Sequence, residues 1–159
     1  MPATTGTAKV TTPADDQILI TREFDAPPEK VFRAHVDPEL FAQWTGPKGM
    51  GIRIDHHDCR TGGSYRYVMS QGGEDYSFNG VFHEVRENEL IVQTFAFEGM
   101  PDDVALERLV LEDLGDGRTR LTSTSLVDSF AGRDAFVASG MEVGVREGYE
   151  RLDEVLARR

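Results

Sequence analysis

The run His56-His57-Asp58-Cys59 places four side chains that can bind metal or move protons next to one another. Alternation of apolar and polar residues predicts a strand here, and adjacent residues of a strand point to opposite faces, so His56 and His57 cannot chelate one ion together. His57 and Cys59 share a face, but zinc needs three or four protein ligands and no third is evident nearby. We therefore expect no metal and no cofactor, and we expect Cys59 to be an ordinary thiol.

His56 and Asp58 have the same parity as the apolar residues of that strand, which directs both toward the core or a cavity. A buried His and Asp need hydrogen bonds, and these could come from each other, from Arg66 or Arg108, or from a ligand. Alternatively, a bulge near Arg60 inverts the faces and leaves both side chains in solvent. A shift of one residue in the strand register moves every later side chain to the opposite face, and this sensitivity favours the second alternative.

Aromatic residues alternate along three predicted strands, so that each set shares one face. Such stripes are typical of a core, and in a fold that holds a cavity the same side chains would form its wall. Trp44, in a predicted short helix, would plug one end or anchor the helices. The aromatic candidates for a cavity wall on the strands are Tyr65, Tyr67, Phe78, Phe82 and Phe95.

A long amphipathic helix is predicted from about Gly132 to Ala157, with Met141 and Val145 on its apolar face. Gly144 and Gly148 lie in that face, although an interior glycine costs a helix about 1 kcal/mol relative to alanine. Either another chain segment approaches closely there, or space remains beside the helix. The second alternative indicates a ligand chamber, which Tyr149 would also line.

Composition narrows the class of protein. The chain has 159 residues, with 17 Lys and Arg against 28 Asp and Glu, a formal charge of −11 and one cysteine. This surface would repel nucleic acid and anionic membranes, and a lone cysteine excludes an intrachain disulfide. No apolar run reaches the length of a membrane span and no signal peptide is evident, so we expect a soluble cytoplasmic protein without membrane insertion.

The elements form one domain in an α+β arrangement. Residues 1–16 have no periodicity and are predicted to be a flexible tail, whereas 17–159 form the domain. A strand at 17–25 precedes two short helices, the second capped by Asp37 and begun by Pro38. Sequential strands joined by tight turns then predict an antiparallel sheet with the helices on one face. Those strands are expected at about 51–59, 64–70, 76–87, 90–98, 104–114 and 118–127.

This order of elements resembles the helix-grip fold of the START-like (SRPBCC) superfamily, in which a curved antiparallel sheet of about seven strands wraps on a long C-terminal helix. Within it, the chain resembles the family named for the C-terminal domain of the activator of the heat shock protein 90 ATPase. The resemblance extends over about residues 18 to 156. It is carried by Ile20-Thr21-Arg22-Glu23-Phe24-Asp25-Ala26-Pro27, Asp37-Pro38-Glu39-Leu40, Trp44-Thr45-Gly46-Pro47, Asp58-Cys59-Arg60-Thr61-Gly62-Gly63, Gly80-Val81-Phe82 and the segment from Gly140-Met141 to Leu152.

The resemblance implies a cavity between the sheet and the long helix. Val145 stands where many relatives look to carry a tryptophan, which would leave more volume beside the helix here. The eukaryotic activator has a separate N-terminal domain that contacts its chaperone, and only residues 1–16 stand in its place here. That departure disfavours a chaperone partner.

Three hypotheses for function follow. The leading one is a non-enzymatic binder of a small hydrophobic or aromatic molecule, oriented by His56, Asp58, Arg66 or Arg108. The second is a polyketide-cyclase- or hydrolase-like enzyme that uses the same chamber, with His56 as general base. The third is an interaction protein that stimulates a chaperone ATPase. A homodimer through the outer face of the sheet also stays open.

Overall fold

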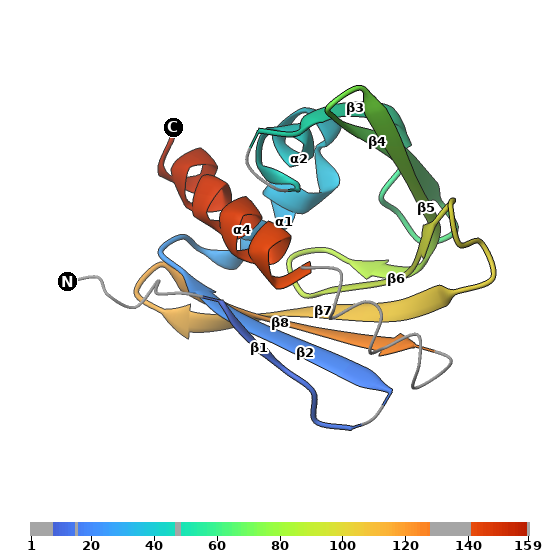
Figure 1. The fold of residues 1–159 in the computed structure, drawn as a ribbon. Coiled ribbons are helices and arrows are strands. Elements are labelled where there is room, and N and C mark those ends of the chain that lie inside the picture. The colour runs from blue at the N-terminus through green and yellow to red at the C-terminus, as the bar shows by residue number, and fades with distance from the viewer. Residues whose placement is uncertain (1–7, 15, 47–48, 128–140, 159) are drawn as a thin grey trace.

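The computed structural model describes residues 8–14, 16–46, 49–127 and 141–158. It is an α+β structure in which one strongly curved antiparallel sheet holds the C-terminal helix in its concave side (Figure 1). The predicted fold class is confirmed, with eight strands in place of about seven. The strands run in the order β1-β2-β8-β7-β6-β5-β4-β3 across the sheet.

Tight turns set the boundaries of the strands. The β7–β8 turn uses Gly115, Asp116 and Gly117, all with positive φ, and Asn88 takes the same conformation in the β5–β6 turn. Glycine adopts this region without steric penalty, and Asn and Asp tolerate it best among the other residues. The strands are β2 (Gln17–Phe24), β3 (Gly51–His57), β4 (Ser64–Gln71), β5 (Glu74–Arg86), β6 (Leu90–Phe97), β7 (Val104–Gly115) and β8 (Arg118–Val127).

The additional strand is β1 (Lys9–Thr11), which pairs antiparallel with β2 through the register Lys9↔Thr21. The prediction that residues 1–16 lack structure is therefore wrong at this segment. The open edge of β2 presents backbone donors and acceptors that three residues of any composition can pair with. Residues 1–7 and 15 of the predicted tail lie outside the described residues.

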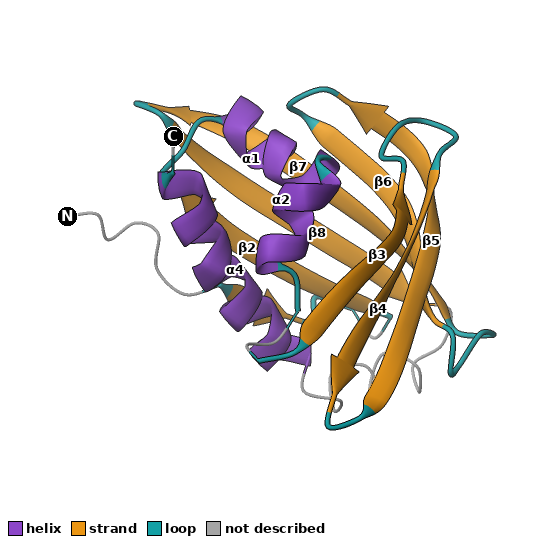
Figure 2. Cartoon of the chain, turned by 90° about the horizontal axis from the view of Figure 1, so that it is seen from above, coloured by secondary structure: helices purple, strands orange, loops and turns teal. Residues whose placement is uncertain are grey.

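The helices are α1 (Pro28–Val36), α2 (Pro38–Trp44) and α4 (Met141–Ala157), and all three lie on the concave face of the sheet (Figure 2). Asp37 caps α2 as predicted, because its carboxylate accepts a 2.9 Å hydrogen bond from the Glu39 amide. The Trp44 indole donates to the Ala34 carbonyl at 2.9 Å and thereby ties α2 to α1. The predicted start of the long helix near Gly132 lies outside the described residues.

Helix α4 is packed along its C-terminal half. Tyr149, Leu152, Val155 and Leu156 are buried, whereas Met141 and Val145, nearer its start, are only partly buried. The close approach occurs at Gly148, where an added Cβ would lie 3.0 Å from the Trp44 carbonyl oxygen. Glycine is thus needed at this position because the end of α2 touches the helix backbone.

A buried ion pair fixes the same half of α4 to the sheet. Arg22 of β2 is almost fully buried and contacts Asp153 at 2.5 Å, and its guanidinium lies 4.8 Å from the centre of the Phe24 ring. A guanidinium in the interior requires such partners, since its desolvation is otherwise uncompensated. The Arg22–Asp153 pair therefore determines where the helix lies over the strands.

The convex face carries exposed apolar side chains on β7 and β8, among them Leu106, Val110 and Leu126. Leu106 and Leu126 are cross-strand partners. A homodimer through this face stays a prediction. Among the described residues, no helix combines the length and the apolar character that crossing a bilayer requires.

Gly80 of β5 lets the ring of Tyr65 lie across the sheet. Tyr65 is paired with Gly80, and its hydroxyl donates to the Thr94 carbonyl of β6 at 2.6 Å. A Cβ at Gly80 would lie 2.0 Å from that carbonyl oxygen and 2.6 Å from the tyrosine ring. Tyr65 can therefore take this inward position only because Gly80 has no side chain.

We expect Gly80→Ala to lower the free energy of unfolding by about 2 kcal/mol or more, because the backbone of β6 cannot move away without breaking its ladder. Chemical denaturation monitored by circular dichroism measures the change. Gly51→Ala is the matched control, because Gly51 is also a strand glycine but an added Cβ there meets nothing within 4 Å. It should alter stability by less than about 0.5 kcal/mol. Equal midpoints for the two variants would contradict this account of Gly80.

Candidate functional site

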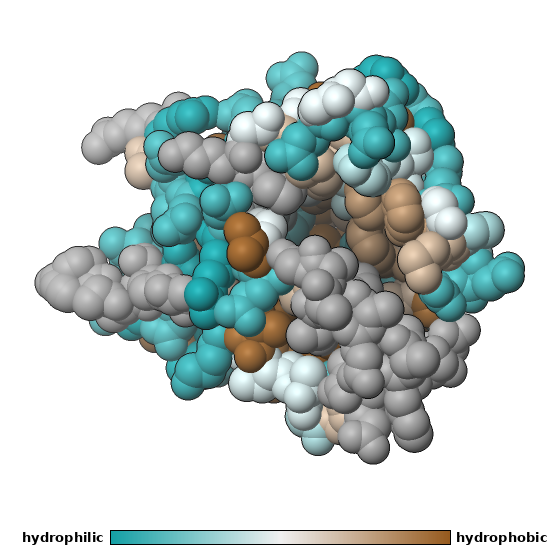
Figure 3. All heavy atoms as spheres, viewed as in Figure 1, coloured by the Kyte–Doolittle hydropathy of each residue, from teal (hydrophilic) through white to brown (hydrophobic). Residues whose placement is uncertain are grey.

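A cavity of about 760 Å³ lies between the concave face of the sheet, α2 and the N-terminal half of α4. Its volume is within the range of small-molecule sites in proteins, about 300–1,000 Å³. Figure 3 shows a hollow in the same region, with apolar side chains at its margin. Among the described residues of α4, the buried ones begin at Gly148, and Met141, Gly144 and Val145 before it line the cavity.

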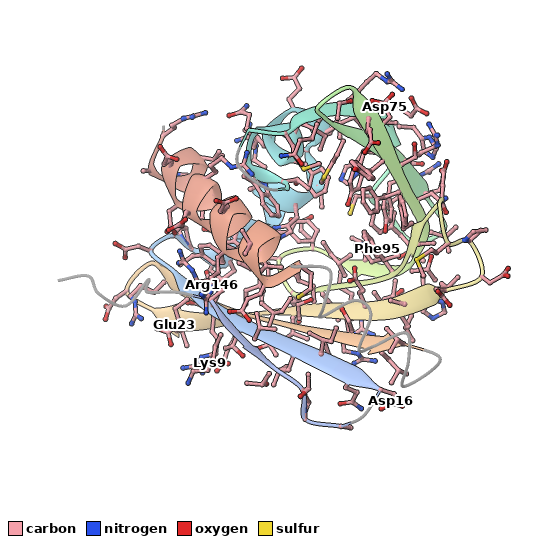
Figure 4. The ribbon with its side chains drawn as sticks, in the orientation of Figure 1. Lys9, Asp16, Glu23, Asp75, Phe95 and Arg146 are labelled. Carbon is pink, nitrogen blue, oxygen red and sulfur yellow. The ribbon has the colours of Figure 1, made fainter. Side chains whose placement is uncertain are left out.

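One wall is a continuous row of aromatic rings across β4, β5 and β6. Tyr65 stacks on Tyr67 with ring centres 6.0 Å apart, Tyr67 on Phe78 at 5.4 Å, and Phe78 on Phe95 at 5.3 Å. Figure 4 shows the labelled Phe95 inside the curve of the sheet. The row follows from the register, because Tyr67 and Phe78 are cross-strand partners and residues of one parity share a face.

The structure brings together most of the residues proposed as ligand-binding from the sequence. Those that line the cavity are Trp44, Tyr65, Tyr67, Phe78, Phe82, Phe95, Met141, Val145 and Tyr149. Gly144 also lines it, so the two helix glycines differ: Gly148 meets α2, and Gly144 borders the space. Three proposed residues, His56, Asp58 and Arg108, do not contribute to the lining.

His56 and Asp58 are exposed and do not line the cavity, so the alternative in which a bulge leaves both in solvent is confirmed. The register of β3 and β4 shifts between Ile54 and His56, so Asp55 is an extra residue that inverts the faces from there on. His56 instead bonds to the Ser64 hydroxyl at 3.0 Å, and Asp58 pairs with Arg60. The bulge lies earlier than the Arg60 position considered from the sequence.

The two arginines proposed as anchors also lie outside the cavity. Arg108 is exposed. The residues of β7 that point inward are odd-numbered, so the even-numbered Arg108 points to the outer face. Arg66 forms a bidentate contact with Glu98, at 2.8 and 2.9 Å, and also pairs with Asp55. Neither guanidinium can orient a ligand in the cavity.

The same bulge turns His57 inward, beside His35 of α1. His57 Nε2 donates to the His35 carbonyl at 2.8 Å, and His35 Nδ1 donates to the Val31 carbonyl at 2.8 Å. The other ring nitrogen of each is buried without a protein partner, namely His57 Nδ1 and His35 Nε2. Burial lowers the pKa of His35 to about 4 and also lowers that of His57, so both remaining nitrogens are bare acceptors at neutral pH.

Glu107 of β7 is the polar group that the sequence analysis missed. It lines the cavity, and its carboxylate accepts from Ser125 at 3.0 Å and from Gln93 at 3.3 Å. Burial raises its pKa. The sequence could have indicated this residue. Glu107 has the same parity as Ala105, Leu109 and Leu111 on β7, and a glutamate is unusual among apolar residues that point inward.

Cys59 also lines the cavity, and burial raises the pKa of its thiol to about 12. Such a thiol is unreactive, because the thiolate is the nucleophile. Within the described part of the chain, no three His, Cys, Asp or Glu side chains come together to hold a metal ion. The cavity is thus mainly apolar, with a few acceptors on its floor and rim.

Comparison with known proteins identifies relatives of the same fold. The family model described as "Activator of Hsp90 ATPase homolog 1-like protein" matches residues 25–157. A search of curated proteins finds no match.

Several solved structures are similar over nearly the whole chain. A protein from Arthrobacter aurescens is 27% identical with a TM-score of 0.85, and the match covers 94% of this chain and 91% of that one. A protein from Chromobacterium violaceum is 26% identical with a TM-score of 0.78, covering 90% and 99%. A protein from Mycobacterium smegmatis has a TM-score of 0.86 at 23% identity, covering 97% and 99%, and supports the fold alone.

The buried neutral His35 predicts a specific dependence of stability on pH. Above about pH 6.5 the imidazole is neutral in both states, and below it the unfolded chain binds a proton that the native state excludes until about pH 4. The free energy of unfolding should therefore fall over this window, by up to about 1.4 kcal/mol per pH unit for this proton.

Chemical denaturation at several pH values measures this effect in His35→Gln and His83→Gln variants. The fall should be shallower in His35→Gln, whereas His83→Gln, which alters an exposed histidine of β5, should follow the wild type. A His35→Gln curve parallel to that of the wild type would show that this imidazole titrates normally in the native state.

Proposed function

The chain belongs to the Activator of Hsp90 ATPase homolog 1-like family within the START-like (SRPBCC) superfamily, and we propose that it binds a small apolar or aromatic molecule in the cavity between the sheet and α4. The observation that carries the proposal is the cavity itself, about 760 Å³ with a continuous aromatic wall. Burial of an apolar ligand there would contribute about 25 cal/mol per Å² of surface removed from water.

The lining suits a flat or branched hydrophobic molecule, and it offers few groups that could recognise polar atoms of a ligand. Tyr67, Phe78 and Phe95 offer ring faces, and Met141 and Val145 offer aliphatic surface from the helix. Methionine side chains adapt to irregular shapes, which suits a cavity wall. Four of them line this cavity, Met50, Met69, Met100 and Met141.

The enzyme alternative loses the base that the sequence suggested for it, since His56 is exposed. His57 lines the cavity, but its unbonded nitrogen is buried, and burial lowers its pKa and makes it a weak base. The family name refers to Hsp90 ATPase activation, which would need an external binding surface. The cavity gives no support to that activity, and we rank the binder first.

Trp44 provides a direct probe, because it lines the cavity and is the single tryptophan of the chain. The neutral compound 2-naphthylmethanol should change Trp44 fluorescence saturably, with one molecule bound per chain by calorimetry. Absence of saturable binding at the solubility limit of the compound would overturn the proposal.

The variant Val145→Trp should fill the cavity and lower the affinity for 2-naphthylmethanol by about tenfold or more, since overlap with the ligand replaces contact. Its stability should stay within about 1.5 kcal/mol of the wild type, because the side chain enters existing space. Calorimetry measures the affinity, because the added tryptophan would contribute to a fluorescence signal.

Val143→Trp is the control, because Val143 lies two residues away on α4 and is 57% exposed. Binding to this variant should match the wild type. If Val145→Trp also retains full affinity while remaining folded, this face of α4 is not the wall of the binding site.

A further inference from the structure

Glu107 is the buried carboxyl group among the described residues that line the cavity. Glu107 accepts from two neutral donors, Ser125 and Gln93, and among the described residues no cation lies within ion-pair distance of it. A carboxylate of this kind in an apolar cavity is costly unless a positive charge or a proton compensates it. The described residues do not supply that positive charge, and burial raises the pKa of Glu107 accordingly.

The remaining charged groups of the lining reinforce this. No Lys or Arg is among the described residues that line the cavity, and the other acidic one is Asp103. The whole chain carries a formal charge of −11. No cationic side chain of the described lining would therefore repel a positively charged ligand group, whereas ionised Glu107 and Asp103 would disfavour anions such as fatty acids.

The two histidines of the described lining add no positive charge. His35 is 7% exposed, its Nδ1 is committed to a carbonyl, and its Nε2 has no protein partner although the residue lines the cavity. His57 Nδ1 is in the same position. Because burial lowers the pKa of both imidazoles, neither supplies a positive charge that could pair with Glu107.

Aromatic side chains line the same cavity as Glu107. Gln93 links Tyr65 to the carboxylate, because its amide nitrogen donates to the Tyr65 hydroxyl at 3.2 Å and to Glu107 at 3.3 Å. Tyr67 and Tyr149 also line the cavity, and burial together with the Glu107 charge raises the pKa of both phenols. Ring faces next to a carboxylate form a favourable environment for an ammonium group, through cation–π attraction and the ion pair together.

We infer that the ligand of this cavity is a basic amine with an apolar or aromatic body, whose ammonium group binds at Glu107. This inference rests on the proposed function and names its ligand class. The hydrophobic body occupies the aromatic wall, and the N–H groups are donated to the carboxylate. The Coulomb attraction between the two charges is stronger in the cavity than in water, and the desolvation of both charges offsets part of it.

Three probes with the same bicyclic body separate charge from shape: 2-naphthylmethylamine, 2-naphthylmethanol and 2-naphthoate. Calorimetry of the full chain at pH 7.5 should show the amine binding about tenfold tighter than the alcohol, and the carboxylate weakest. A preference that is absent or reversed in the wild type overturns the inference, without any variant being needed.

Glu107→Gln keeps the shape and removes the charge. It should reduce the preference for the amine over the alcohol to within about threefold, with the alcohol affinity unchanged within about twofold. Glu87→Gln is the control, because it removes the same formal charge from an exposed turn and should leave all three affinities as in the wild type. A preference that persists in folded Glu107→Gln places the ammonium elsewhere and overturns the assignment.

The outcomes also separate the inference from the function on which it rests. Binding of the alcohol without preference for the amine leaves the cavity a hydrophobic binding site and refutes only the amine. Failure of both the amine and the alcohol to bind refutes the proposed function and the inference together.

Discussion

The structure depends on the described contacts that hold the C-terminal half of α4. The Arg22–Asp153 pair and the close contact of Gly148 with the Trp44 carbonyl hold its C-terminal half against β2 and the short helices. The sheet curves away beneath the other half, because the strands from β6 to β3 continue past the helix (Figure 2). A helix held at one end over a curved sheet leaves a cavity at the other end, and the partly buried Met141 and Val145 border it.

Strand parity and its interruptions determine the chemistry of that cavity. Uninterrupted alternation on β4 and β6 directs aromatic rings inward, and the missing side chain of Gly80 leaves room for Tyr65. Because Asp55 is an extra residue in β3, His57 and not His56 lines the cavity. Because one inserted residue inverts all later faces, a single bulge decides which imidazole meets a ligand.

Much of the fold could be predicted because its signals are local. Turn residues and alternation gave the strands from β2 to β8, and Asp37-Pro38 gave the start of α2. Strand β1 could not be predicted, since its pairing depends on the open edge of β2 and not on its own composition. The aromatic and helix residues of the site followed from parity, whereas His56, Asp58 and Arg108 were misplaced.

Those three errors have two causes. A bulge is set by packing across strands, so the sequence of β3 alone does not reveal it. Arg108 was chosen for its charge and not for its parity, which the same strand would have shown to be outward. Glu107, its neighbour, carried the informative signal, because it is the charged member of the inward set on β7.

The most direct test of the account is NMR of protein labelled with ¹³C in the methyl groups of methionine and valine, titrated with 2-naphthylmethanol. The account predicts nuclear Overhauser effects from the naphthyl protons to Met141 and Val145, across the cavity from the aromatic wall, and none to the exposed Val143 or Val110. Effects confined to Val143 or Val110, or no effects at saturating probe, would show that the space beneath α4 is not a binding site.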